Sequence, residues 1–134
     1  MRGRDTGGQD TGGRDTGRRL GPADLGAPLG ERATLVQFSS AFCQPCRATR
    51  RVLADVAAMV PGVSHVEIDA EERLALVREL RVLKTPTVLV LDAAGREVRR
   101  AAGQPRKADV IAALGQAVEP VAAQVTADGT GVRQ

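Results

Sequence analysis

The sequence predicts an α/β fold with a mixed sheet of four strands, or five if residues 20–32 add a short one, and helices on both faces. Apolar stretches typical of strands alternate with segments of helical periodicity, in the order β-α-β-α-β-β-α. The first two strands are joined through a helix, so they should be parallel. The last two are joined by a short turn, so they should form an antiparallel hairpin.

The first strand, 33–40, is short, β-branched and mostly apolar, as a buried central strand should be. A helix over 44–60 follows, with Pro45 in its first turn and a stop at Pro61-Gly62. The remaining elements are a strand at 63–69, a helix at 70–82, a strand at 85–92, an edge strand at 96–102 and a last helix at 105–118.

Composition divides the 134 residues into one domain, 20–118, and two tails. Residues 1–19 repeat Arg/Gln-Asp-Thr-Gly without an apolar residue after Met1, so we expect a disordered tail. Residues 119–134 lose periodicity and should form a flexible C-terminal tail. The net charge is +3, and five arginines against three aspartates place +2 of it in the first nineteen residues. The nearly neutral remainder argues against nucleic-acid binding.

Cys43 and Cys46 are the only cysteines, and they lie where the first strand passes into the first helix. A helix N-terminus favours a thiolate over a thiol, and Arg47 adds positive charge one turn in. Cys46 is three residues on, within reach of Cys43 for a disulfide. The spacing predicts a reversible dithiol, in which one sulfur attacks a substrate disulfide and the other resolves the mixed disulfide.

Other cysteine chemistries fit this chain less well. A closed zinc site needs four nitrogen or sulfur ligands, and the chain has two cysteines and one histidine, His65. A cysteine hydrolase needs a paired imidazole, and His65 falls on a predicted strand. Two inert buried cysteines fit poorly with a proline-containing helix start. We therefore expect no metal and no cofactor other than the redox-active Cys43–Cys46 disulfide.

The segments LVQFSSAFCQPCR, VEID, LKTPTVLVLDAAGREV and AGQPRKADVIAAL resemble the thioredoxin-like family over residues 33–115. The resemblance implies a thioredoxin-like fold in which Cys43 attacks and Cys46 resolves. It also implies that Pro86 forms a cis peptide bond facing the disulfide and that the backbone of Thr85 pairs with a bound substrate strand.

Several residues differ from the usual pattern of that family. Phe42 replaces a tryptophan and Gln44 a glycine beside the cysteines, and both remain candidates for substrate binding. Gln37 stands in place of a buried aspartate, and a glutamine side chain cannot accept a proton. His65 stands in place of a buried lysine, so two roles are open for it: a base near Gln37, or a solvated or hydrogen-bonded group without a catalytic role. The N-terminal strand and helix of the family are shortened, which suggests a minimal four-strand version.

The expected function is a thiol–disulfide oxidoreductase that reduces protein disulfides and is recharged by an electron-donating reductase. We expect a monomer. We expect it in the cytoplasm, because the sequence has neither the roughly 18 apolar residues of a membrane helix nor a signal peptide. One alternative is a redox-sensing adaptor or binding module with little turnover. Another is a membrane-tethered reductant whose anchor precedes Met1.

Overall fold

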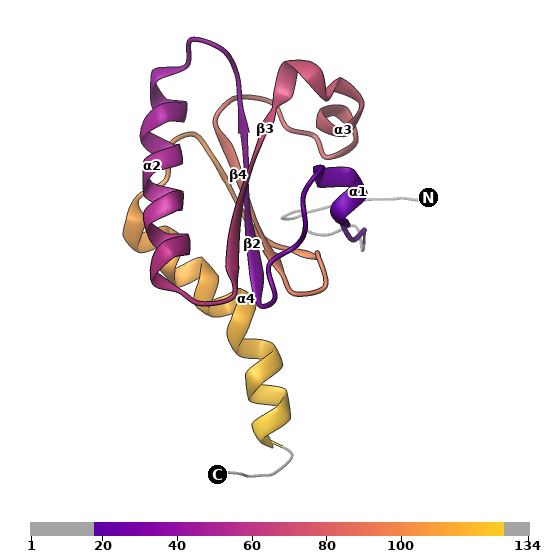
Figure 1. Cartoon of the computed structure of the whole chain (residues 1–134), viewed down its shortest axis with the longest axis vertical. Coiled ribbons are helices and arrows are strands. Elements are labelled where there is room, and N and C mark those ends of the chain that lie inside the picture. The colour runs from indigo at the N-terminus through magenta and orange to yellow at the C-terminus, as the bar shows by residue number, and fades with distance from the viewer. Residues whose placement is uncertain (1–17, 128–134) are drawn as a thin grey trace.

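The computed structural model describes residues 18–127, with side chains up to Val118. A sheet forms the centre of the molecule, with α2 and α4 on one face and α1 and α3 on the other (Figure 1). The strands are β2 (Ala33–Ser39), β3 (Val63–Asp69), β4 (Thr87–Asp92) and β5 (Glu97–Ala102). The helices are α1 (Pro22–Leu25), α2 (Gln44–Met59), the 3₁₀ turn η1 (Ala70–Glu72), α3 (Leu74–Glu79) and α4 (Lys107–Ala127).

The strand order is β3-β2-β4-β5. β2 and β3 run parallel, whereas β2–β4 and β4–β5 are antiparallel. This confirms the mixed four-stranded sheet and places 96–102 at an edge, as expected. In the described part of the chain, the lead-in adds only an isolated bridge between Arg19 and Arg96 and no fifth strand.

Alternate residues of β2 face two separate apolar clusters. Val36 and Phe38 pack on the face covered by α1 and α3, together with Leu20 and Leu25 of the lead-in. Ala33 and Leu35 pack on the opposite face with residues of α2 and α4, including Leu53, Val56, Val110 and Leu114. All seven residues of β2 are buried, so the strand that leads to the cysteines is a rigid central element.

Three predicted elements before α4 differ from the structure. The lead-in forms the short helix α1, in which Pro22 occupies the first helical position, instead of a strand. The helix expected at 70–82 is split, because the Asp69 carboxylate caps a 3₁₀ turn and Arg73 then leaves the helical region. The strand expected from residue 85 begins at Thr87, since Pro86 has no N–H to pair in the sheet.

Helix α4 begins at Lys107 rather than 105 and continues to Ala127, nine residues past its predicted end at 118. The stretch 119–127 lacks apolar periodicity and combines three alanines with Pro120, so local helix propensity does not explain why α4 continues through it. Residues 128–134 of the predicted C-terminal tail lie outside the described residues. The same holds for the predicted N-terminal tail, apart from Arg18 and Arg19.

Candidate active site

Cys43 occupies the N-cap of helix α2, directly after the loop that follows β2. Its sulfur accepts a hydrogen bond from the backbone N–H of Cys46, with an S–N distance of 3.2 Å. The two cysteines form a disulfide, and their Cα atoms are 5.2 Å apart. After reduction, the same N–H and the partial positive charge of the helix N-terminus would favour a thiolate on Cys43.

The two sulfurs differ in accessibility. Cys46 is 1% exposed, because it lies one turn into α2 and faces the sheet. Cys43 is partly exposed at the end of the helix. An external disulfide can therefore approach Cys43 before Cys46, which is the order expected of an attacking and a resolving thiol.

Phe42 and Gln44 flank Cys43, and both are exposed. Phe42 is 97% exposed, and its backbone has a positive φ of 59°. A large apolar side chain with no covering residue can contact a polypeptide that approaches the disulfide. The structure thus leaves both side chains accessible, and their expected part in substrate binding stays a prediction.

The loop before β4 lies against the cysteine loop. The Thr85–Pro86 peptide bond is cis, as expected from the sequence. The hydroxyl groups of Thr85 and Ser40 are hydrogen-bonded at 2.7 Å, and Ser40 lies three residues before Cys43. The Pro86 carbonyl accepts a bond of 2.8 Å from the N–H of Gly103. Thr85 is partly exposed and Pro86 is buried, and their expected contact with a substrate strand is taken up as part of the proposed function.

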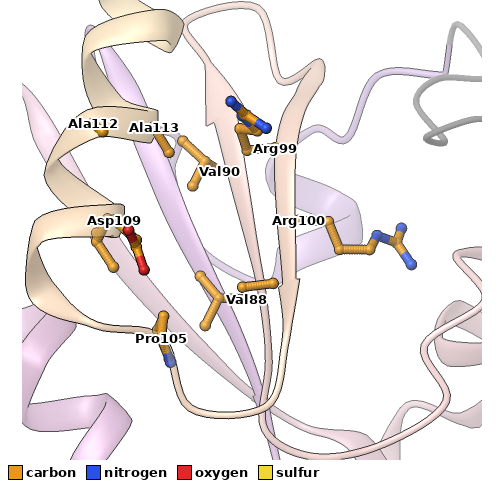
Figure 2. Close-up of a pocket in the computed structure, with 10 residues that line it drawn as sticks. Val88, Val90, Arg99, Arg100, Pro105, Asp109, Ala112 and Ala113 are labelled. Carbon is orange, nitrogen blue, oxygen red and sulfur yellow. The ribbon is translucent and has the colours of Figure 1, made fainter.

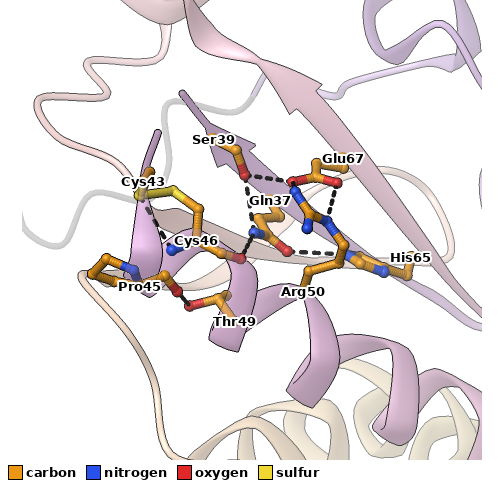
Figure 3. Close-up of polar contacts among 9 residues, drawn as sticks. All are labelled: Gln37, Ser39, Cys43, Pro45, Cys46, Thr49, Arg50, His65 and Glu67. Carbon is orange, nitrogen blue, oxygen red and sulfur yellow. Dashed lines mark hydrogen bonds and ion pairs between the residues drawn. A yellow bond between two sulfur atoms is a disulfide. The ribbon is translucent and has the colours of Figure 1, made fainter. Parts of the chain in front are cut away.

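A polar network lies behind the disulfide, between α2 and the sheet (Figure 3). Gln37 of β2 is fully buried, and its Nε2 donates to the carbonyl oxygen of Cys46 at 2.8 Å and to the hydroxyl of Ser39 at 2.9 Å. Its Oε1 is 3.1 Å from Nε2 of His65. Gln37 thus connects the backbone of the buried cysteine to the neighbouring strand.

An ion pair closes this network toward solvent. The Ser39 hydroxyl donates to Glu67 at 2.7 Å, and Glu67 accepts two bonds from the Arg50 guanidinium at 2.7 and 2.8 Å. The hydrogen bonds from Arg50 lower the pKa of Glu67, aided by Ser39 and opposed by burial. Burial lowers the pKa of His65; the Glu67 carboxylate opposes that shift and Arg50 adds to it. His65 is therefore neutral and Glu67 ionised at neutral pH.

Sequence reasoning singled out Gln37 and His65 but missed Ser39, Arg50 and Glu67. The sequence pattern that could have identified Ser39 and Glu67 is the alternation of side chains along the two parallel strands, in which Gln37 pairs with Glu67. Odd-numbered residues of both strands face α2, and that period places 37, 39, 65 and 67 on one face. Among the described residues, no group of three or more histidine, cysteine or acidic side chains could hold a metal ion.

A separate cavity of about 260 Å³ lies between the β4–β5 hairpin and the first turns of α4 (Figure 2). Its lining is mostly apolar, with Arg99, Arg100 and Asp109 as the charged members. Arg99 donates to Gln116 at 2.7 Å, and Asp109 pairs with Arg106 at 3.4 Å. Neither cysteine lines this cavity, so it is not part of the disulfide site.

Comparison with known proteins agrees with this geometry. The thioredoxin-like domain family matches residues 27–118, which is more than half of the chain. The chain belongs to the thioredoxin-like family. The fold and the resemblance inferred from the sequence are therefore confirmed.

Several thioredoxins are similar to this thioredoxin-like chain. Thioredoxin H-type 1 of Nicotiana tabacum is 32% identical over 78 residues, which cover 58% of this chain and 60% of that protein. Putative thioredoxin H10 of Arabidopsis thaliana is 35% identical over 69 residues, covering 52% and 44%. Among solved structures, a chloroplastic thioredoxin z is 30% identical with a TM-score of 0.58, covering 67% of this chain and 80% of that one. The chain thus spans roughly half the length of these curated relatives.

Proposed function

We propose that this protein is a thiol–disulfide oxidoreductase that reduces protein disulfides through the Cys43–Cys46 pair. The observation that carries the proposal is the asymmetry of the pair at the start of α2. Cys43 is partly exposed and its sulfur accepts a hydrogen bond from the Cys46 N–H, whereas Cys46 is buried. Membership of the thioredoxin-like family supports the same chemistry.

In the proposed cycle, the Cys43 thiolate attacks one sulfur of a substrate disulfide and the other substrate sulfur leaves as a thiolate. Cys46 then attacks Cys43, which releases the second substrate thiol and forms the Cys43–Cys46 disulfide. A reductase supplies the two electrons that restore the dithiol. Apart from this disulfide, the cycle uses no cofactor and no metal.

The substrate, in this proposal, is a polypeptide that lies across the cysteine loop and the loop before β4. Exposed Phe42 and Gln44 would contact it beside Cys43, and the backbone of Thr85, next to Pro86, would pair with it. The bond between Ser40 and Thr85 supports this arrangement, because it holds the two loops together.

We further propose that the protein works as a monomer in the cytoplasm, where thiols are kept reduced. No helix in residues 18–127 is long and apolar enough to cross a membrane.

A reductant should have a reduction potential near those of thioredoxin and glutaredoxin, about −200 to −280 mV. Glutathione titration followed by alkylation and mass measurement tests this, because the chain has no Trp or Tyr for fluorescence. A value near about −120 mV would instead indicate an oxidant.

Trapping of the mixed disulfide tests the two cysteine roles. Cys46→Ser should keep attack and block resolution, so a disulfide-containing peptide stays attached through Cys43. Cys43→Ser should form no adduct, because Cys46 is 1% exposed. Mass measurement under non-reducing conditions counts the adducts.

Adducts on Cys43→Ser but not on Cys46→Ser would reverse the roles. Adducts on neither variant, together with no turnover of insulin by the wild-type protein, would reject the oxidoreductase and favour the redox-sensing adaptor.

A further inference from the structure

The orientation of the Gln37 amide follows from its partners (Figure 3). A backbone carbonyl oxygen can only accept a hydrogen bond, so the atom that faces the Cys46 carbonyl at 2.8 Å must be the NH₂ group of Gln37. The amide oxygen then faces His65 at 3.1 Å. Because this oxygen can only accept, His65 must carry a proton on Nε2 and donate it.

This geometry removes His65 as a direct base for the resolving cysteine. The nitrogen that faces the site already carries a proton and donates it to Gln37, and Gln37 lies between the imidazole and Cys46. Proton uptake by His65 would take place on Nδ1, the other ring nitrogen. Neutral and protonated His65 both donate from Nε2, so the bond to Gln37 persists when the ring titrates.

The remaining groups around Gln37 offer no alternative base. Its hydrogen-bond partners in the described part of the chain are Ser39, Cys46 and His65, and none of them is a carboxylate. Glu67 on β3 is the nearest acid in the network, and Arg50 of α2 binds both of its oxygens. On the β4 side, the residue in register with Gln37 is the apolar Val88.

We propose that Gln37 is a positioning residue, which holds the backbone of Cys46 and is itself oriented by His65, and that the resolving step uses no buried base. This proposal rests on the proposed function. In that step, the Cys46 sulfur bonds to the Cys43 sulfur and the bond between Cys43 and the substrate breaks. The electron pair of that bond leaves on the substrate sulfur, and the Cys46 proton reaches this sulfur through solvent.

Reaction of the reduced full chain with one equivalent of 5,5′-dithiobis(2-nitrobenzoate) separates the two steps in a stopped-flow instrument. Attack by Cys43 releases one coloured thiolate in a first phase whose rate depends on concentration. Resolution by Cys46 releases a second thiolate in a phase whose rate does not. The rate of the second phase is measured against pH for each variant.

In the wild-type protein, the second phase should follow one ionisation, that of the Cys46 thiol. His65→Gln keeps a donor toward Gln37 but cannot titrate, so it should retain both the rate and the shape of this profile. Gln37→Leu removes the donor to Cys46 and should slow the second phase about three- to tenfold while sparing the first. Gln37→Glu places a buried carboxyl beside Cys46, and its titration should add a second ionisation to the profile.

Thr49→Val is the matched control. Thr49 is fully buried in helix α2, which also carries Cys46, and its hydroxyl donates to the Pro45 carbonyl at 2.8 Å rather than to the Cys46 carbonyl. The Thr49→Val variant should keep the rates of both phases within about twofold of the wild-type rates, since only a local helix hydrogen bond is removed.

Two results would overturn the proposal. One is a second ionisation in the wild-type profile that His65→Gln abolishes, because His65 would then act as the base. The other is a Gln37→Leu effect no larger than that of Thr49→Val. Absence of the first phase in the wild-type protein would reject the proposed function itself, and the proposal with it.

Discussion

Helix α1 should contribute substantially to stability, although it has only four residues. Leu25 at its C-terminal end is 4% exposed and packs in the apolar cluster that contains Val36 and Phe38 of the central strand. Truncating a buried leucine to alanine costs about 2–5 kcal/mol of the free energy of unfolding, depending on how far the site collapses. Because α1 has only four residues and can move toward the space left by the truncated side chain, we expect Leu25→Ala to cost about 2–3 kcal/mol.

For a domain of this size, each kcal/mol lowers the melting temperature by about 4–8 °C, so the expected loss is about 8–24 °C. Urea titration followed by far-ultraviolet circular dichroism gives the free energy of unfolding, with the wild-type protein and the Leu25→Ala variant both kept oxidised. Leu83→Ala is the matched control, because it makes the same chemical change at a side chain that is 92% exposed. That variant should stay within about 0.5 kcal/mol of the wild type.

Equal stabilities of the Leu25→Ala and Leu83→Ala proteins would refute this reasoning. Such a result would mean that α1 does not belong to the folded core. The polar contacts of α1 argue otherwise: Asp24 accepts from Arg18 at 2.9 Å and from the Gly21 N–H at 2.8 Å, and Arg73 binds its carbonyl. These bonds join the lead-in to the helical layer on the same face of the sheet.

Three further predictions concern backbone, charge and tail. Gly30→Ala should strongly destabilise the fold, because a Cβ there would lie 2.1 Å from the Ala33 carbonyl oxygen. Gly115→Ala should stabilise helix α4, because a Cβ there would have nothing within 4 Å and alanine favours a helix more than glycine does. Thermal melts of the two variants test both expectations. The lowered pKa of Glu67 means that its ion pair with Arg50 stabilises the protein above the unfolded pKa of about 4.3 and is lost as pH falls through the lower folded value. Glu67→Gln should therefore flatten the acid side of a plot of urea midpoint against pH, and an unchanged slope would contradict the assignment. Deleting residues 1–17 should leave the melting temperature and the dithiol chemistry unchanged, because that segment has no apolar residue after Met1, and a large fall in melting temperature would contradict this.

The order and pairing of the strands could be predicted because they depend on hydrophobic pattern and connection length. The stretch 33–40 is apolar on both faces, and the structure buries every residue of β2. The hairpin of β4 and β5 followed from the turn around Gly95, whose φ is +87°. The position of the cysteines followed from the same pattern, since they come directly after the buried strand.

The segments that were predicted wrongly are those governed by single local contacts. The periodicity of 70–82 fits one helix, but the Asp69 carboxylate accepts the N–H of Glu71 at 2.9 Å and stabilises a separate 3₁₀ turn. An Asx-type contact of this kind competes with helix formation and leaves the apolar pattern unchanged. Similarly, the lead-in contains Gly and Pro at positions that suit either a turn or a helix start. The burial of Leu25 and the hydrogen bond from the Gly21 N–H to the Asp24 carboxylate favour the helix.

The role of His65 shows where sequence reasoning about a site reaches its limit. Its residue type and its strand were both known, but two roles stayed open for a histidine near Gln37: a base, or a solvated or hydrogen-bonded group without a catalytic role. The distinction depends on which end of the Gln37 amide faces the sheet, and the two ends are nearly the same in shape. The Cys46 carbonyl decides it, because this oxygen needs a donor and so turns the amide oxygen toward His65. A contact between a strand and the first turn of a helix therefore fixes the tautomer of a side chain on a third element, and no pattern within any one of these segments contains that information.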